Sequence, residues 1–152
     1  MEFMFDYTII KPHNYAPNRH DIEEIAEFLY HHLEQYGDKK EDIKKCINYA
    51  LSEEPGYGGF IVTVRNKENS ELCGAVIVNE TGMDGYIPEN LLVYIAVHGG
   101  YRGKGLGRSL MEEVMKTANG SIALHVEPDN PARYLYEKLG FTNKYLEMRL
   151  NR

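Results

Sequence analysis

Six residues, Arg102–Gly107, read Arg-Gly-Lys-Gly-Leu-Gly and join an apolar segment to an amphipathic one. Glycines let the backbone approach a phosphate closely, and the first turn of a helix offers unpaired N–H groups and a partial positive charge. Arg102, Lys104 and Arg108 add full positive charges, and arginine can hold phosphate oxygens in a bidentate way. The segment is therefore predicted to bind a phosphate where a strand passes into a helix.

Two common phosphate-binding motifs do not fit this segment. A P-loop requires Gly, four residues and then Gly-Lys-Ser/Thr. Gly103 and Lys104 are instead followed by Gly105, and the residue five positions before Gly103 is His98. A dinucleotide-binding motif requires Gly-x-Gly-x-x-Gly, but its third glycine would fall on Arg108. A tight turn with incidental glycines remains the structural alternative, and the strand–turn–helix context argues against it.

A second group of residues lies downstream, between Asn130 and Phe141. Asn130 is the predicted N-cap of a short helix, Pro131 suits its first position, and Gly140 ends it. Tyr136 lies on the apolar face of this helix, a position typical of a packed side chain.

Two early helices are expected before the sheet segments that carry these groups. Apolar residues at helical spacing predict a first helix that begins near Asp21, with Glu24 as capping-box partner, and ends at Gly37. Asp38 and Glu41 repeat the start signal for a second helix.

Segments rich in β-formers predict six strands, the last of which alternates apolar and polar residues. They are Tyr7–Lys11, Gly59–Arg65, Leu72–Val78, Leu91–Val97, Ser121–Val126 and a C-terminal strand with Leu146, Met148 and Leu150. The apolar character of Leu91–Val97 indicates a strand covered on both faces. The order is β-α-α-β-β-β-α-β-α-β, a mixed α/β sheet in one domain of residues 1–152, with Leu91–Val97 parallel to Ser121–Val126.

Composition narrows the classes of function. The chain has 152 residues and a formal net charge of -6, which argues against a protein that binds nucleic acid through its phosphates. No apolar run approaches the ~20 residues that span a bilayer, and no signal peptide is recognised, so a cytoplasmic protein without membrane contact is expected. Two cysteines, Cys46 and Cys73, are too few for a disulfide framework. His31 and His32 face different sides of a helix, and no metal is expected.

The two motifs together resemble the GCN5-related N-acetyltransferase (GNAT) superfamily. Its signature Arg/Gln-x-x-Gly-x-Gly/Ala is matched by Arg102, Gly105 and Gly107, and its second segment, Asn-x-x-Ala…Tyr-Glu-Lys-x-Gly-Phe, resembles the residues from Asn130 to Phe141. The element order is similar over the whole chain. The resemblance implies acetyl-CoA as co-substrate, held between two splayed parallel strands, Leu91–Val97 and Ser121–Val126.

The resemblance also implies which residues bind the donor. The backbone of the first splayed strand would contact the pantetheine arm and supply the N–H donor for the oxyanion, the loop amides would hold the pyrophosphate, and an asparagine would lie beside the cofactor. These residues are Ile95, Ala96 and Val97; Gly103, Lys104, Gly105, Leu106, Gly107 and Arg108, with Arg102; and Asn130. Tyr136 matches the general acid that protonates the departing thiolate.

The general base is left open by the sequence. Many relatives carry a glutamate in the strand before the loop, but Leu91–Val97 contains no carboxylate. Glu89 is the leading candidate, and Glu80, Asp84, His125 or a water chain are alternatives; an ordinary surface or packing role is open for each. Three tyrosines could line the acceptor pocket or serve as ordinary sheet aromatics: Tyr86, Tyr94 and Tyr101.

The expected activity is transfer of an acetyl group from acetyl-CoA to a primary amine by direct attack in a ternary complex. A small-molecule amine is the first hypothesis for the acceptor. A protein N-terminus or lysine is the second, and a non-catalytic acyl-CoA-binding sensor is the third. The protein is expected to act as a monomer or homodimer.

Overall fold

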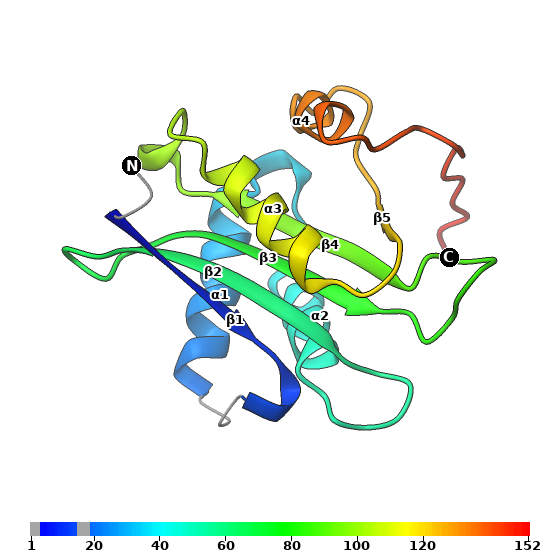
Figure 1. The fold of residues 1–152 in the computed structure, drawn as a ribbon, viewed down its shortest axis with the longest axis horizontal. Coiled ribbons are helices and arrows are strands. Elements are labelled where there is room, and N and C mark those ends of the chain that lie inside the picture. The colour runs from blue at the N-terminus through cyan, green and yellow to red at the C-terminus, as the bar shows by residue number, and fades with distance from the viewer. Residues whose placement is uncertain (1–3, 15–18) are drawn as a thin grey trace.

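The computed structural model describes residues 4–14 and 19–152, which form a five-stranded sheet in the order β1-β2-β3-β4-β5 (Figure 1). The strands are β1 (Phe5–Ile10), β2 (Gly59–Asn66), β3 (Leu72–Glu80), β4 (Asn90–Val97) and β5 (Ile122–Leu124). Neighbours pair antiparallel except β4 and β5, which pair parallel. The predicted mixed α/β fold, its hairpin and its parallel pair are confirmed.

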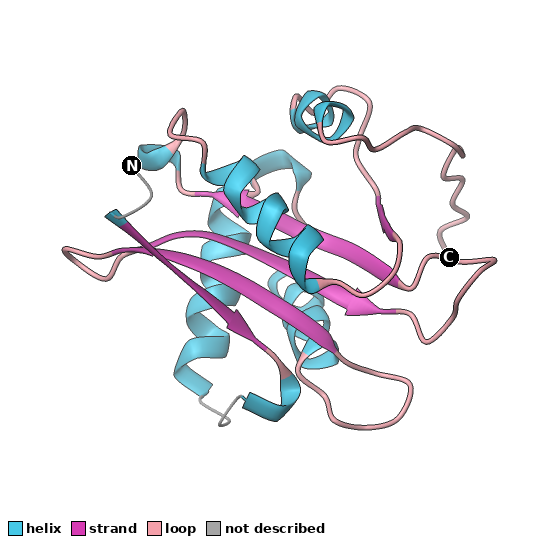
Figure 2. Cartoon of the chain, viewed as in Figure 1, coloured by secondary structure: helices cyan, strands magenta, loops and turns pink. Residues whose placement is uncertain are grey.

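Helices cover both faces of the sheet (Figure 2). The helices α1 (Arg19–His32) and α2 (Lys40–Ala50) lie on one face, and α3 (Leu106–Thr117) lies on the other, while α4 (Ala132–Lys138) follows β5. The short 3-10 helices η2 (Pro12–Asn14), η3 (Glu34–Tyr36) and η4 (Gly99–Tyr101) lie in the connections. No helix of the described residues has the length and apolar character needed to cross a membrane.

The sheet has a hydrophobic core on each face, and successive strand residues contribute to one core and then the other. On β2, Ile61 faces α1 and α2, whereas Val62 and Val64 face α3. All three side chains are fully buried. Burial of a branched aliphatic side chain contributes about 1.5–3 kcal/mol, so both helix layers are anchored mainly through this central hairpin.

The predicted starts of the first two helices agree with the structure to within two residues, but the first helix ends at His32 and not at Gly37. α1 begins at Arg19, so Asp21 lies in its first turn, and Glu24 pairs with Arg65 of β2. α2 begins at Lys40, and its first turn has no side-chain cap from the residue before it. Asp38 instead accepts a hydrogen bond from β4. A short acidic side chain near a helix start can cap locally or reach a distant partner, and Asp38 does the latter.

The predicted coverage of β4 on both faces is also wrong in part. Its residues alternate between buried and half-buried along the whole strand. The half-buried set remains partly open because β5 pairs only with the first three residues of β4, Asn90 to Leu92.

The predicted C-terminal strand is not formed. Residues 141–152 have no regular structure, and Leu146, Met148 and Leu150 are 77–90% exposed. Alternation alone does not make a strand, because a strand also needs an edge with which its backbone can pair. The neighbouring β5 has only three residues and offers a short edge.

Candidate functional site

The parallel strands β4 and β5 separate soon after they meet. Residues Asn90 to Leu92 pair with residues Ile122 to Leu124, and beyond Leu92 the edge of β4 has no strand partner among the described residues. The register between β3 and β4 shifts at the same place, so that Val93 has no partner across the pair. Such a shift is a β-bulge, which bends a strand and re-aims its backbone. The predicted splay therefore begins at a bulge.

The sequence-predicted backbone donors lie in the separated part of β4. Ile95, Ala96 and Val97 follow the bulge and remain hydrogen-bonded to β3 through register pairs with Val76, Ala75 and Gly74. Their other edge is not occupied by a strand among the described residues. An unpaired strand edge accepts an extended ligand through main-chain hydrogen bonds.

The glycine-rich loop connects the end of β4 to α3. Gly103 and Gly105 have φ values of 80°, in the left-handed region, and a Cβ at either position would meet no atom within 4 Å. Gly105 is the N-cap of α3 and supplies no side chain, and the first turn contains no acidic residue. The first-turn amides and the open space beside the two glycines thus fit an anion.

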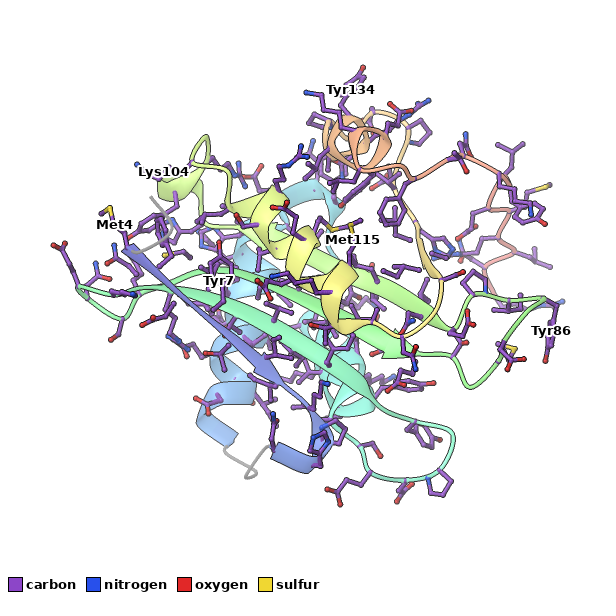
Figure 3. All side chains as sticks on the ribbon, in the orientation of Figure 1. Met4, Tyr7, Tyr86, Lys104, Met115 and Tyr134 are labelled. Atoms are coloured by element: carbon purple, nitrogen blue, oxygen red, sulfur yellow. The ribbon has the colours of Figure 1, made fainter. Side chains whose placement is uncertain are left out.

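The three predicted cations of the loop differ in their contacts. Lys104 lies exposed at the outer end of the loop (Figure 3), and neither it nor Arg108 forms an ion pair with a described residue. Arg102 is engaged: Nη1 lies 3.3 Å from Glu34 Oε1, and Nη2 donates to the carbonyl oxygen of His32 at 3.3 Å. Arg102 therefore joins the loop to the end of α1.

The loop is positioned by a buried leucine and by α4. Leu106 is 3% exposed and belongs to the core between α3 and the sheet. A Cβ at Gly107 would lie 3.6 Å from Leu135 Cδ2, which is an ordinary van der Waals contact. Gly107 thus marks the place where α3 approaches α4.

Asn130 and Tyr136 occupy the predicted positions around α4. The Oδ1 atom of Asn130 accepts from the backbone N–H of Ala132 at 3.0 Å, so the predicted cap is confirmed. Tyr136 is 7% exposed and packs 6.0 Å from Phe141 between ring centroids. Burial raises the pKa of Tyr136 to about 12. No described residue forms a hydrogen bond with its hydroxyl, which leaves that hydrogen available to a ligand.

The structure does not bring Glu89 to the separated part of β4. Glu89 precedes the paired residues, and its Oε1 accepts from the backbone N–H of Ser121 at 3.1 Å. Gly120 has a positive φ and lies so close that an added Cβ would meet Glu89 Cδ at 2.6 Å. This glutamate therefore fastens the turn before β5, and its role as base stays a prediction without a supporting contact.

The other candidate bases have different surroundings. Glu80 ends β3 and hydrogen-bonds through its backbone to Tyr49 and Gly58. Asp84 lies in the exposed β3–β4 loop. His125 follows the last residue of β5, where the strands separate, and its Nδ1 lies 4.0 Å from Glu147 Oε1. Of these three residues, His125 is the one next to the splay in the chain.

The three tyrosines proposed for an acceptor pocket are not brought together. Tyr86 is 79% exposed at the end of the β3–β4 loop and lies far from Lys104 (Figure 3). Tyr101 donates to Glu71 Oε1 at 2.8 Å beside the β2–β3 turn. Tyr94, in contrast, is buried and lies one residue after the bulge.

A contact of Tyr94 was missed by sequence reasoning. Its hydroxyl donates to Asp38 Oδ2 at 2.6 Å, a distance typical of a bond to a carboxylate. Burial, followed by the hydrogen bond to Asp38, raises the pKa of Tyr94. The two residues are 56 positions apart, so no local pattern could have paired them.

A histidine cluster lies beside Arg102. The ring of His32 lies 4.4 Å from that of His98 and 4.7 Å from that of His31. Burial, and then the nearby charges of His98, His31 and Arg102, lower the pKa of His32. The described residues contain no group of three His, Cys, Asp or Glu side chains placed to hold a metal ion.

Known proteins similar to this chain include acetyltransferases. A family model described as the acetyltransferase (GNAT) domain matches residues 56–143. A ribosomal-protein-alanine N-acetyltransferase from Brucella melitensis biovar Abortus 2308 is similar at 17% identity with a TM-score of 0.61, over 97% of this chain and 99% of that one. An aminoglycoside acetyltransferase from an uncultured soil metagenomic sample is similar at 16% identity with a TM-score of 0.64, over 97% and 98%. An aminoglycoside N-acetyltransferase solved in complex with CoA is similar at 14% identity with a TM-score of 0.63, over 97% and 94%.

Proposed function

The chain belongs to the acetyltransferase (GNAT) family, and on that premise we propose that this acyltransferase moves an acetyl group from acetyl-CoA to a primary amine of a small molecule. The observation that supports the proposal most is the separation of β4 from β5 beyond Leu92, directly before the glycine-rich loop. That arrangement offers an open strand edge and an anion-binding turn in one continuous stretch of chain.

In this proposal the loop binds the pyrophosphate of the donor. The amides from Gly103 to Arg108 and the unpaired cations of Lys104 and Arg108 are suited to phosphate oxygens. Arg102 would contribute by keeping the loop against α1, through its contacts with His32 and Glu34. Asn130 would lie beside the donor while its Oδ1 caps α4.

The backbone of β4 and the phenol of Tyr136 would supply the chemistry. An alkylammonium with a pKa near ~10.4 must lose a proton before its nitrogen attacks the thioester carbonyl. A backbone N–H between Ile95 and Val97 would donate to the oxyanion that forms, and Tyr136 would donate its proton to the departing thiolate. The phenol carries its proton at neutral pH, and burial, which raises the pKa of Tyr136 to about 12, makes it a weaker acid than an exposed tyrosine.

The general base is not assigned in this proposal. We compare two of its candidates, Glu89 and His125. Glu89 holds the turn before β5 through Ser121, whereas His125 lies next to the splay. Exchange of each residue separates them: Glu89→Gln is expected to lower stability, and His125→Gln to shift the acidic limb of the pH–rate profile. A normal profile in both variants points to a water chain.

A small molecule is favoured as acceptor over a protein. An open surface hollow of about 510 Å³ lies at the start of α2 and has room for a small ligand. The similar structures include one that acts on a ribosomal protein and two that act on aminoglycosides, so the fold accommodates either class. The chain is further proposed to work in the cytoplasm as a monomer or homodimer, without nucleic acid or membrane contact.

A thiol-release assay tests the proposed function. Acetyl-CoA is offered with a panel of polyamines, amino acids, aminoglycosides and peptides, and CoA release above the no-acceptor rate is expected with small amines. Turnover on peptides alone would move the acceptor to proteins. Tight acetyl-CoA binding with no turnover on any acceptor would favour the acyl-CoA-binding sensor and overturn the proposal.

A further inference from the structure

The segment from Glu34 to Asp38 contacts both sides of the splay. Glu34 lies 3.3 Å from Arg102 of the β4–α3 loop, and the hydroxyl of Tyr36 donates to the carbonyl oxygen of Asp129 in the β5–α4 connection at 3.3 Å. Asp38 accepts from Tyr94 of β4 at 2.6 Å. Every second residue of this segment is thus tied to β4 or to a connection after β4 or β5. The segment therefore crosses from one separated strand to the other.

The backbone of this segment is held in an uncommon conformation. Glu34 has a φ of 55°, in the left-handed region, although it is not a glycine. Such a conformation costs on the order of 1 kcal/mol and persists where surrounding contacts hold it, often at ligand sites. The ion pair to Arg102 and the Tyr36 hydrogen bond are those contacts. Asp38 is consequently placed by a pre-organised segment beside β4.

The carboxylate of Asp38 is not neutralised by a protein cation. Tyr94 is its hydrogen-bond donor, and no ion pair of the described residues includes it. Two nearby lysines are engaged elsewhere: Lys40 pairs with Glu27 at 2.5 Å, and Lys44 pairs with Glu23 at 2.9 Å. Lys39, the next residue in the chain, is exposed and forms no ion pair with Asp38. Asp38 is exposed and lines an open surface hollow of about 510 Å³, together with Tyr30, Lys39, Lys40 and Glu41. A carboxylate that is held by Tyr94 and has no ion-pair partner can receive a cationic group of a ligand in this hollow.

The reacting nitrogen is an unsuitable partner for this carboxylate. A carboxylate within ~4–6 Å of an ammonium favours its charged form, whereas acetyl transfer needs the neutral amine. A permanent ion pair with Asp38 is instead compatible with a second ammonium on the same acceptor. One amine can then lose its proton near β4 while the other stays charged on Asp38.

We propose that Asp38 binds a second, non-reacting ammonium group of the acceptor, so that the preferred substrates are diamines or polyamines. Tyr94 is the positioning residue that aims the carboxylate, and the segment from Glu34 to Asp38 holds it across the splay. This inference rests on the proposed transfer of acetyl to a small amine and adds to it the charge pattern of the acceptor.

The test compares 1,4-diaminobutane with butylamine, which have the same carbon chain and differ by one amino group. We expect the wild-type protein to have a kcat/KM about tenfold to a hundredfold higher for the diamine, since a charge-assisted contact has that value. Asp38→Asn should raise the KM for the diamine by a similar factor and leave butylamine turnover and acetyl-CoA affinity unchanged. The asparagine Oδ1 can still accept from Tyr94, so the variant keeps the positioning contact.

A matched control and a second variant sharpen the result. Asp42→Asn removes the same charge four residues later, from an exposed side chain of α2. It should leave the kcat/KM for both amines unchanged. Tyr94→Phe should raise the diamine KM by a smaller factor than Asp38→Asn, because it frees the carboxylate without removing it. Equal kcat/KM for the two amines in the wild type, or equal losses for both in Asp38→Asn, would overturn the inference.

Failure of the proposed function has a separate signature. If neither amine is acetylated, calorimetry of 1,4-diaminobutane binding in the presence of CoA measures the Asp38 contact alone. Binding to the wild type that is lost in Asp38→Asn supports the diamine site even without turnover. No diamine binding to the wild type contradicts it.

Discussion

Replacement of Tyr136 by phenylalanine separates chemistry from folding in this protein. The side chain is 7% exposed and packs against Phe141, and its hydroxyl has no hydrogen-bond partner among the described residues. Removal of an unpaired hydroxyl from an apolar site changes stability by less than about 1 kcal/mol. Loss of a general acid lowers turnover by about 10²–10⁴-fold. Tyr136→Phe should therefore lower kcat by at least about a hundredfold in a folded protein that binds acetyl-CoA normally.

The pKa of Tyr136 provides a second measurement on the same variant. The folded value of about 12 exceeds the ordinary value of 10.0, so the neutral phenol is favoured by folding. Its contribution to stability is complete below pH 10 and is lost as the pH rises towards 12. Two pKa units correspond to about 3 kcal/mol. Urea unfolding at pH 8 and pH 11 should show a smaller alkaline loss in Tyr136→Phe than in the wild type.

Controls distinguish the roles of this tyrosine. Tyr134→Phe removes a hydroxyl from the same helix at a side chain that is 67% exposed, and it should change neither turnover nor stability. Tyr136→Ala should cost about 3–5 kcal/mol through the cavity that it leaves. A Tyr136→Phe variant with kcat within twofold of the wild type would refute the general-acid assignment.

Three further predictions follow from the loop, the histidine cluster and the hairpin. Gly105→Ala should weaken acetyl-CoA binding by about tenfold in calorimetry, because φ is 80° at this position and the new Cβ would enter the space proposed for the phosphate. Gly107→Ala is the control: its Cβ makes an ordinary contact, so the affinity for acetyl-CoA should be unchanged. The lowered pKa of His32 means that its contribution to stability is present above pH 6.5 and is lost as the pH falls. His32→Asn should therefore reduce the difference between the urea midpoints at pH 7.5 and pH 5. An unchanged difference would contradict this prediction. Gly59→Ala should cost about 3 kcal/mol or more in urea unfolding, because its Cβ would lie 2.0 Å from the carbonyl oxygen of Val78; a near-native midpoint would show that the strand can shift.

The sequence predicts best where local chemistry decides the structure. The hairpin of β2 and β3 follows from two β-rich segments around a polar turn, and the loop before α3 follows from its glycines. Asn130 caps α4 as its type and position indicate. In each case the residues that determine the structure are close in the chain.

The sequence predicts poorly where distant partners decide. Asp38 has the residue type and position of a helix cap, yet its carboxylate accepts a hydrogen bond from Tyr94, which lies 56 residues away in the chain. The hydroxyl of Tyr36 donates a hydrogen bond to the backbone of Asp129, 93 residues away, and no periodic pattern in the sequence predicts this contact. The C-terminal alternation around Met148 satisfies the pattern of a strand, but pairing requires an edge, and β5 provides only three residues. The proposed acceptor side depends on such contacts between residues distant in the chain, which a local sequence pattern does not predict.

Binding of acetyl-CoA to the wild-type protein tests the central claim most directly. A calorimetric titration should give one site per chain, and thermal unfolding at acetyl-CoA concentrations about a hundredfold above Kd should show a stabilisation of about 2.7 kcal/mol. For a chain of this length that stabilisation corresponds to a rise in Tm of about 5–10 °C. Neither heat of binding nor a shift in Tm at millimolar acetyl-CoA would contradict the assignment of the splayed strands and their glycine-rich loop as the donor site.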